Sequence, residues 1–327
     1  MRARRRRHRG YVLIVTLALL VLTASLLVGV SRAAFRHVIE SHDAADSLQR
    51  RWAVTSCRSA VLPYGEQVLA GVEDRQNRPV AVYRAMVKLG NQTCDLIISD
   101  EQAKANVNAL LDRYDDAEVR SMLQRSLAGT GLAGRVRVRS AVVPENPAKA
   151  PAGPATRPAT EPAALPQAIS GLGQIFDATP PGDLVAERYG KRAATDLVTC
   201  WGSGQLNIRR ARAEVLALSA GRGLSDMQIS RLIRARDETF QNKNARSRMS
   251  ITGSPARPLS IPTDPLQRIL GSAGLNPSAV SLAVPLTLSS KCHSLWVVSH
   301  DARRDSYYLT VLDETDPEHP RNFSFLW

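Results

Sequence analysis

The sequence lacks the short motifs by which many enzymes are recognised. It has no G-x-x-x-x-G-K-[S/T] loop for nucleotide phosphates, no H-E-x-x-H helix for zinc and no G-x-S-x-G turn for a nucleophilic serine. Its six histidines are dispersed along the chain instead of clustering. We therefore expect a protein that is not an enzyme.

Cysteine is scarce, and the four cysteines stand singly at Cys57, Cys94, Cys200 and Cys292. Because no C-x-x-C spacing occurs, neither a zinc site nor a thioredoxin-type motif is supported. In an oxidising compartment these cysteines have three possible disulfide pairings. The sequence does not choose among the pairings, and buried free thiols are an equal alternative.

Charged residues are missing from one long stretch. Residues Tyr11–Val30 contain no charged side chain, and at about 1.5 Å rise per residue a helix of this length crosses a hydrocarbon core about 30 Å thick. Six arginines lie within residues 1–10, and cations that flank a span hold that end on the cytoplasmic side. We expect a single-pass membrane protein with a cytoplasmic amino terminus.

The basic leader also accounts for much of the positive charge. The formal net charge of the 327 residues is +13, and removing the six leader arginines leaves +7. Membrane topology therefore explains the charge better than nucleic-acid binding does.

Proline is absent before Pro63, and Gly29 is the only glycine between Tyr11 and Leu62. The membrane helix should therefore continue beyond the lipid, and a helix of about 50 residues is about 75 Å long. Apolar residues recur along its second half with helical spacing, at Val38, Ala45, Leu48, Trp52 and Cys57. We expect a sheet to cover this face.

Strand-like segments rich in β-branched and aromatic residues lie on both sides of a helix-rich block. They are residues 80–89, 94–99, 248–252, 280–288, 294–300 and 307–313, with 323–327 as an edge. Residues 100–245 show mostly helical periodicity, interrupted by a Pro- and Ala-rich segment at 144–166 that should be an exposed linker. The sequence predicts an α+β fold in which a helical domain, 100–245, divides a sheet domain into 31–99 and 246–327.

Two segments, one on each side of the linker, have similar sequence patterns. Asn106-Val107 and Asn207-Ile208 each follow a polar turn and precede an expected helix. Asparagine accepts hydrogen bonds from the free amides of a first helical turn, so both asparagines are expected to be helix caps. The second segment continues into a helix–hairpin–helix pattern around Gly221 and Gly223.

The junction Arg9-Gly10-Tyr11-Val12-Leu13-Ile14 resembles the type IV prepilin signal. The resemblance implies that a prepilin peptidase cuts after Gly10 and methylates the new amino terminus at Tyr11. Residues 1–10 would then be a leader, and residues 11–30 the transmembrane half of the first helix. Pilin-like subunits usually carry glutamate five residues after the cut, where Val15 stands here. That absence is characteristic of the K-type minor pseudopilin of type II secretion systems.

The resemblance to the K-type family continues to about residue 275. It includes Asn106-Val107-Asn108 and the segment Trp201-Gly202-Ser203-Gly204-Gln205-Leu206-Asn207, which mark paired SAM-like helical domains in that family. The resemblance implies a pilin-like long N-terminal helix packed on an antiparallel sheet, with an inserted all-helical domain. It also implies an inner-membrane protein with a periplasmic C-terminal domain, which caps the tip of the pseudopilus with I-type and J-type minor pseudopilins.

The helix–hairpin–helix pattern also resembles membrane-anchored DNA-uptake receptors. Seven arginines would suit phosphate contacts, namely Arg209, Arg210, Arg212, Arg222, Arg231, Arg234 and Arg236. Such receptors end shortly after the hairpin helices, whereas this chain continues into predicted strands. Nucleic acid is therefore the disfavoured partner.

An acidic cluster near the end of the sequence carries oxygen ligands of the kind that calcium prefers. Its members are Asp313, Glu314, Asp316 and Glu318. Loops of some pseudopilins are similar in binding calcium. Because Pro317 and Pro320 favour an ordinary turn, we expect no cofactor.

Overall fold

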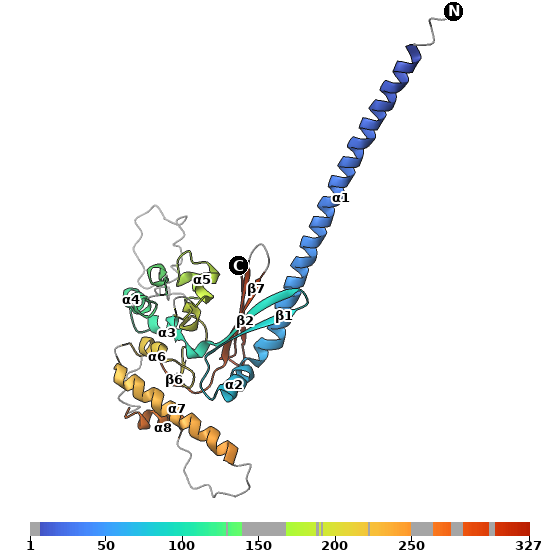
Figure 1. The fold of residues 1–327 in the computed structure, drawn as a ribbon. Coiled ribbons are helices and arrows are strands. Elements are labelled where there is room, and N and C mark those ends of the chain that lie inside the picture. Colours follow the sequence, from blue (N-terminus) through green and yellow to red (C-terminus); the bar gives the residue numbers. More distant parts are fainter. Residues whose placement is uncertain are drawn as a thin grey trace, which may run out of the picture. The chain divides into compact units, whose positions relative to one another are not determined.

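The computed structural model describes residues 7–128, 130–138, 168–187, 190, 192–221, 223–249, 264–275, 284–300 and 305–327. Side chains are described within these ranges except at 7–10 and 241–249. The ribbon begins with a long helix and ends in strands of an antiparallel sheet (Figure 1). Residues 1–55 and 56–327 form two compact units. The expected linker at 144–166 lies outside the described residues.

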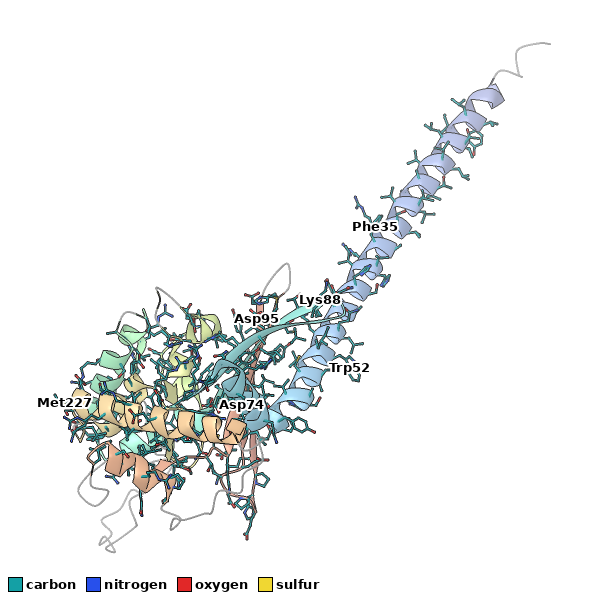
Figure 2. All side chains as sticks on the ribbon, turned by 60° about the horizontal axis from the view of Figure 1, so that its bottom comes forward. Phe35, Trp52, Asp74, Lys88, Asp95 and Met227 are labelled. Carbon is teal, nitrogen blue, oxygen red and sulfur yellow. The ribbon has the colours of Figure 1, made fainter. Side chains whose placement is uncertain are left out.

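The first helix, α1, runs without interruption over Arg7–Val61. It ends where Pro63 enters the 3-10 turn η1, Leu62–Tyr64, because proline has no amide hydrogen to continue the helical ladder. The predicted continuation of the helix beyond Val30 is thus confirmed. Of the predicted apolar face, Cys57 is buried, at 4% exposed. Val38, Leu48 and Trp52 belong to the other compact unit, so their coverage by the sheet stays a prediction. Figure 2 labels Trp52 on this helix.

Five antiparallel strands form the main sheet in the order β1-β2-β7-β8-β9. The strands are β1 Val82–Leu89, β2 Gln92–Asp100, β7 Cys292–His300, β8 Asp305–Asp313 and β9 Arg321–Leu326. A two-residue turn joins β1 to β2, and its Gly90 has a φ of +61°, which glycine adopts without steric cost. The predicted strands in these regions are confirmed, including the edge strand near the end of the chain.

The two faces of the sheet are covered by different parts of the chain. Face A, which carries Cys94, Leu96 and Ile98, is covered by α2, Gly65–Gln76, whose Leu69 and Val72 are buried. Face B, the opposite side, carries Ile97, Trp296 and Leu309, and these side chains belong to the same hydrophobic cluster as the helices between β2 and β7. Alternation of side chains along a strand produces this division.

The segment between the neighbouring strands β2 and β7 contains helices and two-residue strands, several of which are labelled in Figure 1. They are η2 Glu101–Ala103, β3 Ala105–Asn106, α3 Val107–Leu111, α4 Asp116–Ser126, η3 Ala133–Arg135, η4 Leu172–Gln174, α5 Pro181–Val185, η5 Ala194–Asp196, β4 Val198–Thr199, β5 Leu206–Asn207, α6 Ala213–Ala220, α7 Asp226–Met249, α8 Pro265–Ser272 and β6 Leu286–Thr287. The expected separate helical domain is not confirmed, because this segment and the sheet lie in one compact unit and share one core.

The helix-rich block also contains strand pairs that periodicity did not indicate. Inside the block β3 pairs with β4, and β5 pairs with β6, each as a two-residue parallel ladder. β6 itself lies in the predicted strand 280–288, of which residues 280–283 are not described. The expected boundary at 245/246 falls inside α7. The predicted strand at 248–252 is wrong at Arg248 and Met249, which belong to α7, and its other residues are not described.

Candidate functional site: an exposed apolar helix and a buried charge cluster

The first functional surface is the amino-terminal half of α1. Every side chain from Tyr11 to Val30 is exposed. Its hydroxyl groups are satisfied within the helix, since Thr16, Thr23 and Ser25 donate to carbonyl oxygens three residues earlier at 2.9–3.0 Å. Among the described residues one helix is long and apolar enough to cross a membrane, with a mean hydropathy of 2.7 in its most apolar window. This surface suits lipid or other apolar helices.

The residues of the prepilin-like junction all lie in α1. Gly10 belongs to its second turn, and the Tyr11 side chain is 70% exposed. Val15 is 44% exposed on the following turn. Cleavage after Gly10, methylation of Tyr11 and a role for Val15 stay predictions.

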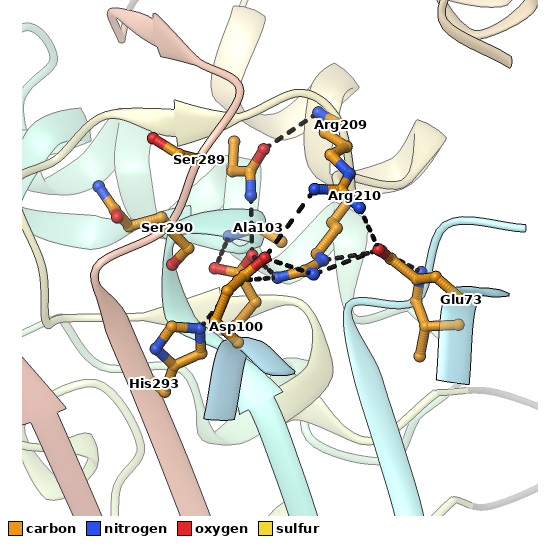
Figure 3. Close-up of polar contacts among 12 residues, drawn as sticks. Glu73, Asp100, Ala103, Arg209, Arg210, Ser289, Ser290 and His293 are labelled. Carbon is orange, nitrogen blue, oxygen red and sulfur yellow. Dashed lines mark hydrogen bonds and ion pairs between the residues drawn. The ribbon is translucent and has the colours of Figure 1, made fainter. Parts of the chain in front are cut away.

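The second feature is a cluster of charges around the buried guanidinium of Arg210, which follows β5. Arg210 donates from Nε to Glu73 Oε1 at 2.7 Å and from Nη1 to Glu66 Oε2 at 2.5 Å. Its Nη1 also lies 3.3 Å from Asp100 Oδ2. Figure 3 shows the guanidinium between Glu73 and Asp100. One cation thereby joins α2, the end of β2 and the segment after β5.

Neighbouring side chains complete the cluster. Arg209 donates from Nη2 to Glu73 Oε2 at 2.6 Å, and its guanidinium lies over the Phe240 ring, 5.6 Å from the centroid. The Asn207 side-chain amide donates to Asp100 Oδ2 at 2.8 Å. His293 of β7 lies 3.4 Å from Glu66 Oε2. Each carboxylate of the cluster therefore has at least one donor.

Contacts within the cluster shift the pKa of two of its members, Glu66 and Arg210. Burial alone would raise the pKa of Glu66, but hydrogen bonds from His293 and Arg210 hold that pKa at about 2. Burial disfavours the charged form of Arg210, but its hydrogen bonds to Glu73 and Glu66 raise the pKa above the ordinary arginine value. Glu66 and Arg210 therefore stay ionised at neutral pH. Because its members are hydrogen-bonded to one another, the cluster ties α2, the end of β2 and the segment after β5 together.

Two of the four acidic residues considered for calcium, Asp313 and Asp316, accept hydrogen bonds from other residues of the chain. Asp313 at the end of β8 accepts from the Gly202 amide at 3.2 Å and from the Thr315 hydroxyl at 2.6 Å. Asp316 accepts from the Glu318 amide at 3.1 Å. Among the described residues no group of three or more candidate ligands could hold a metal ion. These contacts are typical of a turn.

Three of the arginines considered for phosphate contacts are used inside the fold. Arg210 is 2% exposed, Arg209 pairs with Glu73, and Arg236 is buried and donates to Ala211 O at 2.6 Å. The hairpin between α6 and α7 uses its own amides, since Gly221 and Gly223 donate to the Leu218 and Ala220 carbonyls. These groups are therefore unavailable to a nucleic-acid phosphate.

Asn106 and Asn207, which lie in similar sequence segments, have different roles in the structure. Asn106 accepts from the amides of Asn108 and Ala109 and caps α3, as predicted. Asn207 accepts from the Arg209 amide at 3.2 Å, but α6 begins only at Ala213, so Asn207 forms a turn and caps no helix. The prediction was wrong for Asn207 because β5 and the turn before α6 occupy the expected first helical turns.

All four cysteines are buried free thiols. Cys57 lies near the end of α1 and is 4% exposed, and Cys94 lies in β2 and is fully buried. Burial raises the pKa of Cys292 well above the ordinary thiol value and raises that of Cys200 as well, with the Glu101 carboxylate contributing to both.

Sequence reasoning missed the Arg210 cluster. Glu66 and Glu73 are seven residues apart and so share one face of α2, and two adjacent arginines follow Asn207. Both features can be seen in the sequence, but neither the glutamate pair nor the arginine pair indicates which residues it contacts. Glu66 and Arg210 are 144 positions apart.

The fold combines a long amino-terminal helix with an antiparallel sheet, which is consistent with a pilin-like α+β arrangement. The chain matches no protein-family model and no curated protein. Among solved structures it is similar to a chain of the GspK-GspI-GspJ complex of the type 2 secretion system from enterotoxigenic Escherichia coli, with 12% sequence identity and a TM-score of 0.38. The match covers 88% of this chain and 99% of that chain. The residues of the helix and the sheet, rather than this similarity, carry the functional proposal.

Proposed function

We propose that this protein is a K-type minor pseudopilin of a type II secretion system, a non-enzymatic subunit that caps the tip of a periplasmic pseudopilus. The observation that carries the proposal is the helical, uncharged and fully exposed stretch Tyr11–Val30 directly after Gly10 and a basic leader. A helix retained after leader removal would anchor the protein in the inner membrane and present its carboxyl-terminal part to the periplasm.

Assembly would use the exposed apolar side chains of α1 for lateral packing against sister helices. Beyond the span this surface continues through Phe35, Ile39 and Leu48 to Trp52. Phe35 and Trp52 are the labelled side chains on α1 in Figure 2. I-type and J-type minor pseudopilins are the proposed partners. Val15 would leave no buried carboxylate to pair with a subunit above, which suits a terminal position.

Mass spectrometry of the mature protein tests the proposal. The full chain would be purified from membranes of cells that contain a prepilin peptidase, and we expect it to begin at Tyr11 with one added methyl group. A start at Met1, or after Ala34, would contradict the assignment. Gly10→Val should leave the leader attached, because a branched side chain replaces the hydrogen at the cut. Gly29→Ala, in the same helix, is the matched control and should be processed normally.

A second measurement addresses partners. The full chain, purified from membranes under mild detergent, should carry pilin-like subunits with it, whereas Leu20→Lys should reduce both insertion and recovery of those subunits. Gel shift with duplex DNA at near-physiological salt separates the DNA-receptor alternative, because binding there would favour a nucleic-acid partner. We expect no shift, since the buried arginines described above are already paired.

A further inference from the structure

A pocket of about 580 Å³ lies between face B of the main sheet and the segment that begins with α5. Its floor comes from β1, β2, β7 and β8, and its wall includes Gly182, Val185 and Glu187. Pockets of about 300–1,000 Å³ are the usual size for small molecules or single side chains of a partner. The pocket is separate from the Arg210 cluster, with which it shares no residue.

One row of side chains crosses the floor of the pocket. Met86, Asp95, Val298 and Tyr307 are register partners on β1, β2, β7 and β8, so they lie side by side on face B. Since neighbouring strands are about 4.8 Å apart, the row is about 14 Å long. Val298 in the middle of the row is 5% exposed, whereas Met86 at its end is 72% exposed. The floor thus offers an apolar surface with one carboxylate beside it.

The wall of the pocket is held to the sheet at two places. A Cβ atom added to Gly182 would lie 2.7 Å from the Tyr307 hydroxyl oxygen, so the α5 backbone packs directly on β8. On the β1 side, Arg84 donates from Nη1 to Val185 O at 3.0 Å and from Nη2 to the Asp196 carboxylate at 3.0 and 3.1 Å. The pocket is therefore formed before any ligand arrives.

The polar donors that line the pocket are largely used within the protein. The two ring nitrogens of His300 lie 2.9 Å from Asp95 Oδ2 and 2.9 Å from Asp305 Oδ1. The Tyr307 hydroxyl donates to Asp305 Oδ2 at 3.4 Å, and the Arg84 guanidinium is engaged as described above. A ligand that has only acceptors would find few donors here.

Two carboxylates at the pocket, in contrast, each keep a free oxygen. Asp95 Oδ2 contacts His300, and Glu187 Oε1 lies 3.4 Å from Arg84 Nε, but in the described part of the chain Asp95 Oδ1 and Glu187 Oε2 have no partner. These two side chains are 48% and 50% exposed. Lys88 lies in the next row of β1 and does not line the pocket, and Figure 2 labels both Lys88 and Asp95. Free acceptors beside an apolar floor suit a cationic donor on a carbon chain.

We propose that this pocket binds an alkylammonium or alkylguanidinium group, whose charged head donates to Asp95 Oδ1 and whose carbon chain lies on Val298 and Met86. Glu187 contributes a second negative charge at the wall. A charge-assisted hydrogen bond distinguishes this head from a neutral alcohol, and the two carboxylates repel an anionic head. The same chemistry occurs in free amines and in the lysine and arginine side chains of proteins. The proposal does not depend on the secretion role proposed above.

The test compares three probes that share one carbon chain, namely n-butylammonium, n-butanol and butyrate. Each would be titrated into the full-length protein in a nonionic detergent near neutral pH, and binding would be followed by saturation-transfer NMR of the probe with protein-free micelles subtracted. We expect saturable binding of n-butylammonium, at least about ten-fold tighter than that of n-butanol, and no saturable binding of butyrate. Equal binding of n-butanol and n-butylammonium, or no saturable binding of n-butylammonium, would overturn the proposal.

Variants locate the site on the sheet. Asp95→Asn keeps the shape of the side chain and should weaken n-butylammonium binding by about ten-fold, because it removes the charge that accepts from the head. Glu187→Gln should weaken binding less, since its carboxylate acts from the wall. Glu314→Gln, an exposed carboxylate outside the pocket, is the matched control and should bind as the unmodified protein does. Unchanged binding in Asp95→Asn would show that the probe is held elsewhere.

A further pair of probes separates the two sources of the cation. The pentapeptide Ala-Ala-Lys-Ala-Ala with blocked ends would be compared with the same peptide carrying norleucine in place of lysine. Tighter binding of the lysine peptide than of n-butylammonium would assign the pocket to a side chain of a partner protein, and weaker binding would assign it to a free amine. Binding of the norleucine peptide as tight as that of the lysine peptide would contradict recognition of a cation.

Discussion

Replacing the buried arginine of the charge cluster is the sharpest test of how this fold is held together. Arg210→Met keeps a long side chain but removes the cation that contacts Glu66, Glu73 and Asp100. The Asp100 side chain is fully buried and that of Glu73 is 7% exposed. Neither can recover a full shell of water when its partner is lost.

The expected cost follows from those buried carboxylates. Removing one partner of a buried ion pair typically destabilises a protein by about 3–5 kcal/mol, because the remaining charge is left uncompensated. We expect Arg210→Met to fall in that range, which corresponds to about two to three and a half decades in the folding equilibrium constant. Glu66 contributes less to the cost, since its side chain is 40% exposed and water replaces part of the lost interaction.

The measurement is equilibrium unfolding in urea of the full chain in detergent, followed by tryptophan fluorescence. Trp201 and Trp296 are 5% and 1% exposed, so both should report on loss of the shared core. Arg234→Met on the exposed side of α7 is the matched control and should change the free energy of unfolding by about 0.5 kcal/mol or less. Adding Glu73→Gln to Arg210→Met should restore part of the loss, because one of the unpaired charges is then removed.

A loss for Arg210→Met no larger than that of Arg234→Met would refute the reasoning. So would a double variant that is no more stable than Arg210→Met, since the cost would then come from packing and not from unpaired charge.

Three further predictions concern pH and one backbone position. Because the pKa of Glu66 is lowered in the folded protein, its carboxylate contributes to the free energy of unfolding above about pH 4.5, and this contribution is lost as the pH falls towards 2. The free energy of unfolding of Glu66→Gln should therefore depend less on pH over that window. Hydrogen bonds to Asp95 and Asp305 raise the pKa of His300. The contribution of protonated His300 to the free energy of unfolding should therefore be complete below pH 6.5 and should disappear as the pH rises through the raised pKa of the folded protein. His300→Gln should abolish this loss in pH-dependent unfolding. Gly221 has a φ of +58° and an added Cβ would lie 2.2 Å from the Tyr114 hydroxyl, so Gly221→Ala should lower the free energy of unfolding by about 1–3 kcal/mol, whereas Gly173→Ala, which meets no atom within 4 Å, should be nearly neutral.

The sequence predicted elements that depend on local pattern. The missing proline before Pro63 predicted the length of α1, and runs of β-branched and aromatic residues predicted β1, β2, β7 and β8. These signals are local because a helix or strand is specified by its own periodicity and by the residues that end it. The edge strand β9 was also expected from Phe323 and Phe325.

Other elements depended on partners far away in the chain. Residues 100–114 have helical periodicity, yet Asp100 ends β2 in register with His293 and only Val107–Leu111 is α-helical. Strand pairing with β7 and β4 outweighs the local preference there. The Arg210 cluster was missed for the same reason, because single charged side chains carry no pattern that indicates a distant partner.

The position of the charge cluster explains how a long insertion is held to the sheet. The chain leaves the sheet at Asp100 and returns at Cys292 and His293, and Asp100 and His293 are paired neighbours on β2 and β7. Arg210 comes from the middle of the insertion and makes five hydrogen bonds to Glu66, Glu73 and Asp100 at this point. An apolar contact would hold the same surfaces together with less dependence on direction, whereas a guanidinium fixes both the register and the angle of its partners. Displacing the insertion from α2 would therefore leave three carboxylates without this cation, at the point where the chain leaves the sheet.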